Sequence, residues 1–279
     1  MTDRIITPDQ IEAFGKHLQR EEKSDATQEK YLRDVRAFSL FTGKEQITKE
    51  LVMAYKKSCL ERGYAVRSIN SMLASINSFL EFQGWSDSKV KSIRLQRQIF
   101  CTEEKELTKA EYLRLLNASR GDPQLNLVLQ TICATGIRVS ELRYFTVEAV
   151  RRGEVTVNCK NKTRTILVPG KLRKLLQDFA RRQNIKTGLI FLGGNGKPLD
   201  RSRIWRRMKQ LCQAAGVAAS KVFPHNLRKL FARTFYAVEK DIAKLADLLG
   251  HSSINTTRIY IMTTGVEHRK KLERLGLVI

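Results

Sequence analysis

The chain has 279 residues, of which 42% are hydrophobic, so it can build a core of ordinary globular proportions. Lysine and arginine outnumber aspartate and glutamate by 51 to 28, which gives a formal net charge of +23. A charge of that size repels itself in a compact chain and favours a polyanionic partner, first nucleic acid and second an anionic membrane. No stretch reaches the ~18 apolar residues of a membrane-spanning helix, and the start of the chain lacks the apolar segment of a secretory signal.

The cysteines and histidines indicate no metal site. The five cysteines form no CxxC pair, and the four histidines stand at no zinc spacing relative to them. We therefore expect reduced thiols in a cytoplasmic protein. The positive charge is unevenly divided, with a net +4 over residues 1–100 and +19 over residues 101–279. The second part of the chain should therefore make most of the contact with nucleic acid.

Residues 1–88 are predicted to form an N-terminal helical domain. Pro8 suits the first turn of a helix, and apolar side chains then recur at helical spacing in four stretches separated by short breaks. This pattern predicts an antiparallel bundle with no catalytic residues of its own. The four apolar stretches are Ile11–Leu18, Tyr31–Phe41, Leu51–Cys59 and Ile69–Leu80.

Residues 89–106 lack strong periodicity and are predicted to form a basic linker between two domains. An ordinary solvated surface is the alternative. The basic side chains that we expect to contact DNA here are Lys89, Lys91, Arg94 and Arg97.

A second domain is predicted to begin at residue 107. Thr108 and Glu111 have the spacing of a capping box, so a helix should start there. Two alternating stretches rich in valine, isoleucine and threonine, Glu154–Val157 and Thr165–Val168, predict a β-hairpin closed by the polar turn Cys159–Arg164. The rest of the domain is predicted to be helical. The expected fold is therefore mainly α with one small antiparallel hairpin, in two domains.

Two pairs of side chains each contain an arginine that could bind an anion. Glu141 follows Arg138 by three residues and could fix its guanidinium, although a surface ion pair is the alternative. His225 and Arg228 have the same spacing after a proline, and an imidazole beside a guanidinium suits a phosphate. The alternative for this second pair is a buried histidine beside a solvated arginine.

Two further candidates lie near the end of the chain. Gly250 is typical of a helix end, so His251 is predicted to begin a new helix, where backbone N–H groups favour an anion. Tyr260 follows nine residues later, about two and a half turns on. Taken alone, Tyr260 is more typical of a core aromatic residue.

Together these residues suit the attack of a phenol on a phosphodiester. Phosphoryl transfer requires positive charge at the non-bridging oxygens, and two guanidiniums can supply it in place of Mg²⁺. A tyrosine nucleophile forms a covalent intermediate that stores the energy of the broken strand. The strand could then be rejoined without ATP or another cofactor.

Three segments resemble the motif boxes of the tyrosine recombinase (phage integrase) family: Ala134–Leu142, Pro224–Arg228 and Leu249–Tyr260. Their order and spacing match the family over residues 107–260, which would be its catalytic domain. The N-terminal bundle resembles the family's SAM-like core-binding domain. The length of the chain resembles that of Xer-type resolvases and compact integrases of mobile elements.

The resemblance implies a role for each matching residue. Tyr260 would be the nucleophile, forming a 3′-phosphotyrosine and freeing a 5′-hydroxyl. Arg138 and Arg228 would hold the scissile phosphate. His225 would hydrogen-bond the phosphate and assist proton transfer at the tyrosine, and His251 would donate a further hydrogen bond.

The resemblance also implies a supporting glutamate and a lysine acid. Glu141 would support the site from behind. The family uses a lysine on the hairpin turn as general acid for the leaving oxygen, and this shorter turn offers Lys160, which we favour, or Lys162. At Lys229 many family members have another histidine, a change that we expect to matter little.

Residues 261–279 are predicted to form a C-terminal tail with a helix over Val266–Leu275. In the family such a segment often docks on a neighbouring protomer, and the alternative is a helix packed on its own domain. The resemblance implies a clamp around double-stranded DNA and a homotetramer that joins two sites and exchanges strands through a Holliday junction. Binding should weaken steeply with salt.

Two other activities compete with site-specific recombination. A type IB topoisomerase would share the tyrosine chemistry and relax supercoils as a monomer. A DNA-binding protein without cleavage would keep the fold, but every catalytic position is occupied here. The sequence leaves open integration, excision, dimer resolution and inversion.

Overall fold

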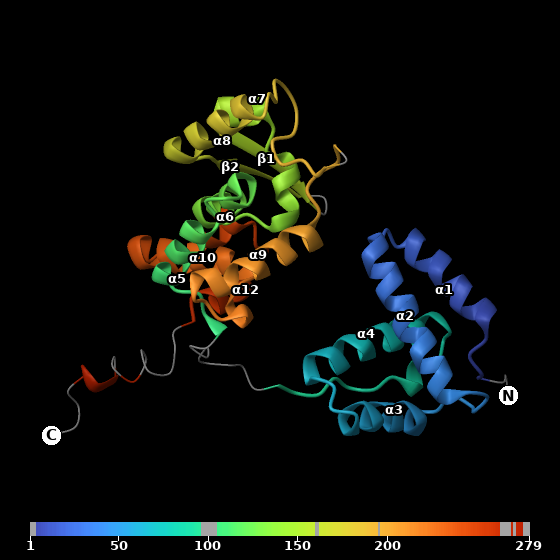
Figure 1. The fold of residues 1–279 in the computed structure, drawn as a ribbon. Coiled ribbons are helices and arrows are strands. Elements are labelled where there is room, and N and C mark those ends of the chain that lie inside the picture. The colour runs from blue at the N-terminus through green and yellow to red at the C-terminus, as the bar shows by residue number, and fades with distance from the viewer. Residues whose placement is uncertain are drawn as a thin grey trace. The chain divides into compact units, whose positions relative to one another are not determined.

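The computed structural model divides into two compact units, Met1–Arg97 and Gln98–Ile279 (Figure 1). We describe each unit by itself. The structure describes residues 4–95, 105–159, 162–194, 196–262, 269 and 272–275.

The N-terminal unit is a helical bundle, as predicted. Thr7 begins the first helix with a capping box, since its hydroxyl accepts from the Gln10 backbone and the Gln10 side chain accepts from Thr7. Rings from three helices meet in the core, where Phe14 packs edge-on against Phe79 at 5.3 Å between centroids. The helices are α1 (Pro8–Arg20), α2 (Asp25–Thr42), α3 (Lys49–Glu61) and α4 (Val66–Phe82), followed by a short 3₁₀ turn, Ser86–Ser88.

The structure corrects the start of the predicted linker. Val90 is buried in the N-terminal core and exchanges two hydrogen bonds with Asn77, of 2.8 and 3.1 Å. Ile93 does the same with Asn70, at 2.8 and 2.9 Å. These asparagines on α4 satisfy the backbone of an extended segment, which the sequence does not reveal because the segment has no periodicity of its own. Residues 90–93 therefore belong to the N-terminal unit.

The basic residues of this segment have different environments. Lys89 lies 3.2 Å from Glu81, so its charge is partly paired. Lys91 and Arg94 are exposed. Arg97 lies outside the described residues.

The second unit is mostly helical with a two-stranded antiparallel sheet, which confirms the predicted fold class. Thr108 and Glu111 form the predicted capping box. The elements before the first strand are α5 (Lys109–Ala118), α6 (Pro123–Thr135), a 3₁₀ helix Val139–Tyr144 and α7 (Val147–Arg152). Those that follow are β1 (Glu154–Cys159), β2 (Lys162–Leu167), α8 (Gly170–Arg182), α9 (Arg201–Ala215), α10 (Pro224–Glu239), α11 (Ile242–Leu249) and α12 (Ile254–Tyr260).

The hairpin is longer than predicted. Its register runs from Glu154 opposite Leu167 to Cys159 opposite Lys162. The polar residues 162–164, predicted as turn, therefore belong to β2. A strand can contain polar side chains when one face of the sheet is exposed. The turn predicted from the polar residues alone was therefore too long.

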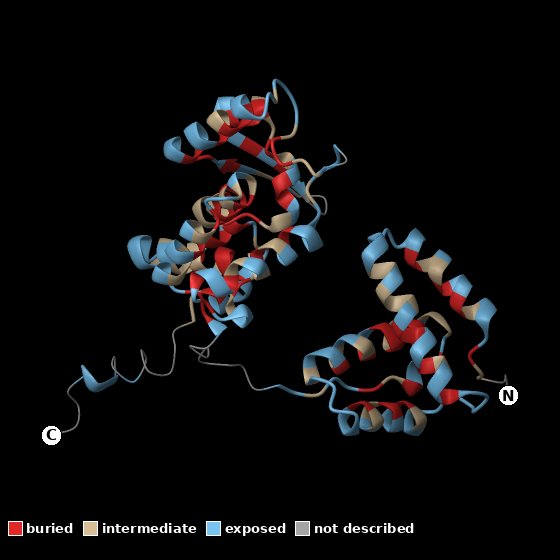
Figure 2. Ribbon diagram, viewed as in Figure 1, coloured by how far each residue is buried: buried red, intermediate tan, exposed pale blue. Residues whose placement is uncertain are grey.

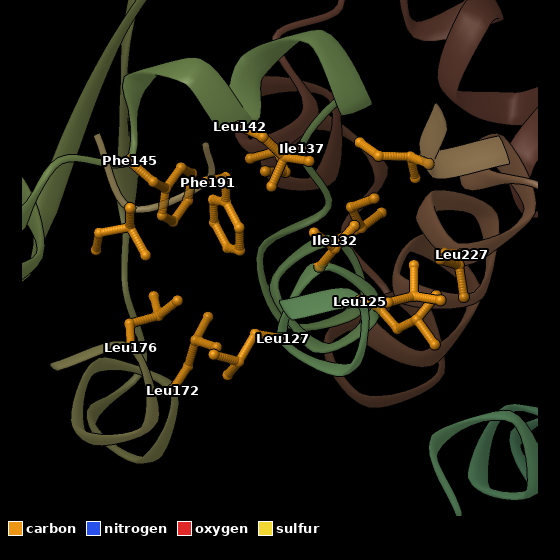
Figure 3. Packing of buried hydrophobic residues seen from close by; sticks show 14 of the residues in the cluster. Leu125, Leu127, Ile132, Ile137, Leu142, Phe145, Leu172, Leu176, Phe191 and Leu227 are labelled. Atoms are coloured by element: carbon orange, nitrogen blue, oxygen red, sulfur yellow. The ribbon is translucent and has the colours of Figure 1, made fainter. Parts of the chain in front are cut away.

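The second unit holds a large apolar cluster and a smaller one formed by Ala232, Leu245, Leu249 and Tyr260. Figure 3 shows Leu125, Ile132 and Leu227 on one side of the large cluster, with Phe145 and Phe191 on the other. Buried positions follow the inner faces of the helices in both units (Figure 2). Within the described residues, no helix is both long and apolar enough to cross a membrane.

Candidate active site

A buried arginine forms the centre of the candidate site. Arg228, on the first turns of α10, is only 1% exposed. Its guanidinium donates to the Gly136 carbonyl at 2.6 Å and to the Leu249 carbonyl at 2.7 Å. These carbonyls stand at the carboxyl ends of α6 and α11, where the helix dipoles are negative and stabilise a cation. The fold therefore fixes this guanidinium in place while it keeps its charge.

A second arginine is held by a buried carboxylate. Glu141 is 1% exposed. Its carboxylate accepts hydrogen bonds from the backbone N–H and the side chain of Arg138, at 2.7 and 3.1 Å. It also accepts from Arg164 on β2 at 2.6 Å. Arg164 in turn donates to the carbonyl of Leu248, at the end of α11. The alternative of a surface ion pair is thus wrong, because the Glu141 carboxylate is buried and joins the 3₁₀ helix to the hairpin, and Arg164 continues the connection to α11.

The ring of His251 has its hydrogen bonds set by its neighbours. Its Nε2 lies 2.9 Å from a guanidinium nitrogen of Arg228, and its Nδ1 lies 2.9 Å from the hydroxyl of Thr257. An arginine can only donate, so Nε2 accepts and the proton sits on Nδ1, which donates to Thr257. Thr257 is fully buried.

Tyr260 lies between the two histidines. The centroid of its ring is 5.0 Å from that of His225 and 5.0 Å from that of His251. The central carbon of the Arg228 guanidinium lies 5.9 Å from the same centroid. Tyr260 is 8% exposed and also packs in an apolar cluster with Ala232, Leu245 and Leu249. One side chain therefore combines burial in the core with proximity to two imidazoles and a guanidinium.

An open hollow of about 640 Å³ lies beside these residues. Three predicted site residues, Arg138, His225 and Arg228, line it, and α9 contributes further positive charge and an aromatic ring. This combination suits a nucleotide backbone, because arginines bind phosphate and an aromatic face stacks on a base. The α9 residues are Arg201, Ser202, Trp205 and Arg206.

Burial, together with the nearby cations, shifts the pKa values of the titratable groups. Burial, opposed by its neighbours Tyr260 and Glu141, lowers the pKa of Arg228 to about 10, so the guanidinium stays charged at neutral pH. Burial and the nearby arginines lower the pKa of His251 to about 4. Partial burial, Lys229 and Arg228 lower the pKa of His225 as well. Both imidazoles are therefore neutral at pH 7 in the absence of an anion.

The neutral His251 predicts a loss of stability in acid. The unfolded chain, with an ordinary histidine pKa of 6.5, takes up a proton that the folded chain refuses until about pH 4. Stability contributed by this histidine is complete above pH 6.5 and falls as the pH decreases to about 4, by at most about 1.4 kcal/mol per pH unit. His251→Gln removes the titration, so urea unfolding should show a shallower decline between pH 6.5 and 4. Equal slopes in both proteins would contradict this pKa.

Comparison with known proteins identifies the family. Residues 105–265 match the phage integrase family, and residues 11–86 match the phage integrase N-terminal SAM-like domain. The first match alone covers more than half of the chain. The chain belongs to the phage integrase family. It is therefore a tyrosine recombinase, an enzyme of site-specific recombination.

Individual relatives of the family match along most of their length. The tyrosine recombinase XerA of Pyrococcus furiosus is 28% identical, with 100% of this chain and 98% of the relative covered. The tyrosine recombinase XerD of Pseudomonas aeruginosa is 30% identical, with 85% and 86% covered.

Solved structures of the family share the fold. A lambda integrase dimer (residues 75–356) bound to a COC′ core site aligns with a TM-score of 0.75 and 18% identity, over 93% of this chain and 96% of that one. The XerH recombinase bound to difH substrate aligns with a TM-score of 0.70 and 17% identity, over 98% and 84%.

The structure brings together five of the residues that the family motifs point to: Arg138, His225, Arg228, His251 and Tyr260. Lys160 lies outside the described residues. Lys162 is described only as a strand residue opposite Cys159, so the choice between the two lysines stays a prediction. Most of residues 261–279 also lie outside the described residues. Within the predicted helix Val266–Leu275, the structure describes residue 269 and residues 272–275, of which 269, 272 and 273 are helical and 274–275 form a turn.

The predicted helix start at His251 is wrong. α12 begins at Ile254 and is capped by Ser253. The backbone N–H of His251 instead donates a hydrogen bond of 2.9 Å to the carbonyl of Ala246, which closes the end of α11. His251 therefore faces the site from a connection between helices.

Arg164 is a site residue that the sequence analysis missed. It lies in the polar stretch assigned to the turn, where nothing distinguished it from the neighbouring lysines. Strand alternation offered a signal, since Arg164 pairs with the buried Val157 in the register.

The described residues hold no obvious metal cluster. No group of three histidine, cysteine, aspartate or glutamate side chains gathers in the described part of the chain. Three cysteines, Cys59, Cys133 and Cys212, are free thiols.

Proposed function

We propose that the protein cleaves and rejoins DNA strands through a 3′-phosphotyrosine intermediate formed on Tyr260. The observation that carries the proposal is the position of the Tyr260 ring, 5.0 Å from each histidine ring and against the Arg228 guanidinium. Membership of the phage integrase family supports it. No other group in this cluster is a comparable nucleophile.

The site residues divide the chemistry between them. Arg138 and Arg228 bind the non-bridging oxygens of the scissile phosphate. Their positive charge stabilises these oxygens most strongly when the pentacovalent transition state forms and the negative charge on the oxygens increases. The Tyr260 oxygen attacks phosphorus, the bond to the 5′-oxygen breaks, and the phenol proton passes to the neutral His225. Two guanidiniums provide the positive charge that a metal ion provides in other phosphoryl transfers, so the reaction proceeds without metal or ATP.

The leaving oxygen needs a proton. We assign this role to a lysine at the tip of the β1–β2 hairpin, with Lys160 favoured over Lys162. Arg164, in the same strand as Lys162, ties the hairpin to Glu141 and so to Arg138. Strand β2 is therefore connected, through Glu141, to the arginine that we propose binds the phosphate. Rejoining reverses the steps, with a 5′-hydroxyl attacking the phosphotyrosine.

The DNA partner is a pair of double-stranded recombination sites. Solved relatives are described as a lambda integrase tetramer bound to a Holliday junction and as XerH bound to difH substrate. We propose the same kind of assembly here: a homotetramer on two sites, with the N-terminal unit, extended through residue 93, as the core-binding domain and residues 107–260 as the catalytic domain. Lys91, Arg94 and Arg97 would add phosphate contacts, and residues 261–279 would contact a neighbouring protomer.

The biological role of the recombination is also proposed from the relatives. The curated relatives are Xer recombinases, which favours dimer resolution or the integration and excision of a mobile element, in the cytoplasm.

A suicide substrate tests the proposed chemistry. A nick next to the cleavage point lets the short 5′-hydroxyl fragment diffuse away, so the covalent protein–DNA adduct accumulates. Wild type should form the adduct on its cognate site, and Tyr260→Phe should form less than about 10⁻³ as much, because phenylalanine cannot attack. Gel shifts should show unchanged DNA binding by Tyr260→Phe.

Three results would contradict the proposal. Adduct formation by Tyr260→Phe would place the nucleophile elsewhere. Failure of wild type on every cognate site would favour a binding protein without cleavage. Relaxation of supercoils by a monomer, with no requirement for paired sites, would instead favour a type IB topoisomerase.

A further inference from the structure

Two residues at the start of the second unit lie against the helix that carries His225 and Arg228. Glu106 is 7% exposed. One of its carboxylate oxygens lies 3.1 Å from the Lys229 ammonium, and the other lies 3.4 Å from the Arg233 guanidinium. The Lys229 side chain is only 21% exposed, so water screens this pair weakly. The contacts join residue 106 to two successive turns of α10.

Asn226 makes a second connection to the same segment. Its side-chain amide donates a hydrogen bond of 2.7 Å to the Lys105 carbonyl and one of 2.8 Å to the Lys221 carbonyl. The residue is buried, and its amide oxygen has no hydrogen-bond partner in the described structure. Burial of an unpaired oxygen is unfavourable. The two donated bonds thus fix the orientation of the side chain.

Helical spacing places these contacts beside the site. Asn226, Lys229 and Arg233 follow one another at i, i+3 and i+7, which forms one stripe along α10. His225 and Arg228 form the adjacent stripe, each one residue earlier. A displacement of residues 105 and 106 would therefore rotate or shift the two side chains that contact the phosphate.

Lys229 also adds charge to the site. Many members of the family have a histidine at this position, whereas this chain has a lysine paired with a buried glutamate. The cations that act on His225 are Lys229, Arg228, Arg138 and Arg201, the Tyr260 ring lies near it, and His251 interacts with it electrostatically. A carboxylate that pairs with Lys229 reduces the net positive charge there.

We propose that Glu106 is a positioning residue: it holds the first turns of α10 against the segment entering the catalytic unit and offsets the charge of Lys229 beside His225. The proposal rests on the proposed function, because His225 is taken to accept the phenol proton. It also explains the lysine that replaces the family's histidine. The sequence alone predicts that this replacement matters little, and the variant Lys229→Met also tests that prediction.

The test measures the rate of adduct formation on the suicide substrate from pH 5 to pH 9, with enzyme in excess over DNA. Glu106→Gln should lower the maximal rate by roughly ten- to a hundredfold, as a small misplacement of catalytic groups does. It should also move the acidic limb of the profile to lower pH, because an unpaired Lys229 lowers the pKa of His225 further. Glu106→Asp should recover part of the rate.

Two partner variants separate charge from packing. Lys229→Met should move the acidic limb to higher pH, since a cation beside His225 is lost. The double variant Glu106→Gln, Lys229→Met should return the limb toward its wild-type position. Asp122→Asn serves as control, because it breaks another partly buried ion pair of the same unit, with Arg207, that does not act on His225.

The outcomes are distinct. An unmoved limb in Glu106→Gln and Lys229→Met would overturn the proposal, even if the rate fell, since lost packing lowers the rate at every pH alike. A limb displaced equally by Asp122→Asn would overturn it as well. Failure of the proposed function would show earlier, as the absence of a Tyr260-dependent adduct in wild type.

Discussion

Arg228→Lys should lower the rate of covalent adduct formation by at least about 10²–10³-fold, the effect of removing one donor that stabilises a developing oxyanion. The guanidinium spans the Gly136 carbonyl, the Leu249 carbonyl and the His251 ring, all within 2.9 Å. A lysine ammonium is a single point and cannot serve this fork together with a phosphate. The measurement is single-turnover cleavage of the suicide substrate at pH 7.5.

Charge loss should add to the geometric effect at high pH. Burial lowers the pKa of Arg228 to about 10. The same burial would lower the pKa of a lysine from about 10.4 into the assay range. The residual activity of Arg228→Lys should therefore fall as the pH rises from 7 to 9, while wild type keeps its arginine protonated.

Arg114→Lys is the matched control. Arg114 also bridges two carbonyls at a helix end, those of Ala215 at 2.9 Å and Gly216 at 3.2 Å, but it lines no part of the hollow that Arg138, His225 and Arg228 line. Its replacement should cost about 1 kcal/mol of stability, the value of a typical hydrogen bond, and leave cleavage unchanged. Equal cleavage rates for Arg228→Lys and wild type would contradict the role of Arg228 in binding the phosphate.

Residues that act within one helical turn could be predicted from the sequence. The i, i+3 spacing of His225 and Arg228 requires only that a helix forms after Pro224, and α10 begins there. The same spacing placed Glu141 within reach of Arg138, although a 3₁₀ helix rather than an α-helix connects them. Local periodicity and caps are sufficient for such pairs.

Contacts between distant segments could not be predicted in this way. Arg164 reaches Glu141 and Leu248, and Glu106 reaches Lys229, across 23 to 123 residues of chain. Nothing in the local pattern marks such a partner, because the packing of whole elements decides it. The burial of Val90 and the position of His251 outside a helix have the same origin.

Gly136→Ala should lower the stability of the catalytic unit by about 2–4 kcal/mol and reduce cleavage as well. Gly136 ends α6 in the left-handed conformation, at φ +63°. A Cβ atom there would lie 2.3 Å from Cδ1 and 2.5 Å from Cε1 of the Phe231 ring, so this ring, or the helix α10 that carries it, would have to shift. The carbonyl of the same residue accepts from Arg228, and Arg138 follows two residues later. Strain at this position therefore reaches both arginines.

Gly216→Ala separates the two causes of that loss. Gly216 ends α9 in the same conformation, at φ +57°, but nothing lies within 4 Å of its added Cβ. The control should therefore show only the backbone strain, about 1–2 kcal/mol, with normal cleavage. Urea unfolding and the suicide-substrate rate, measured on both variants, test the difference. Suppose that Gly136→Ala were as stable as Gly216→Ala and cleaved DNA as fast. The Phe231 ring would then move aside freely. In that case the close approach of α6 to α10 would not be needed to hold the Gly136 carbonyl against Arg228.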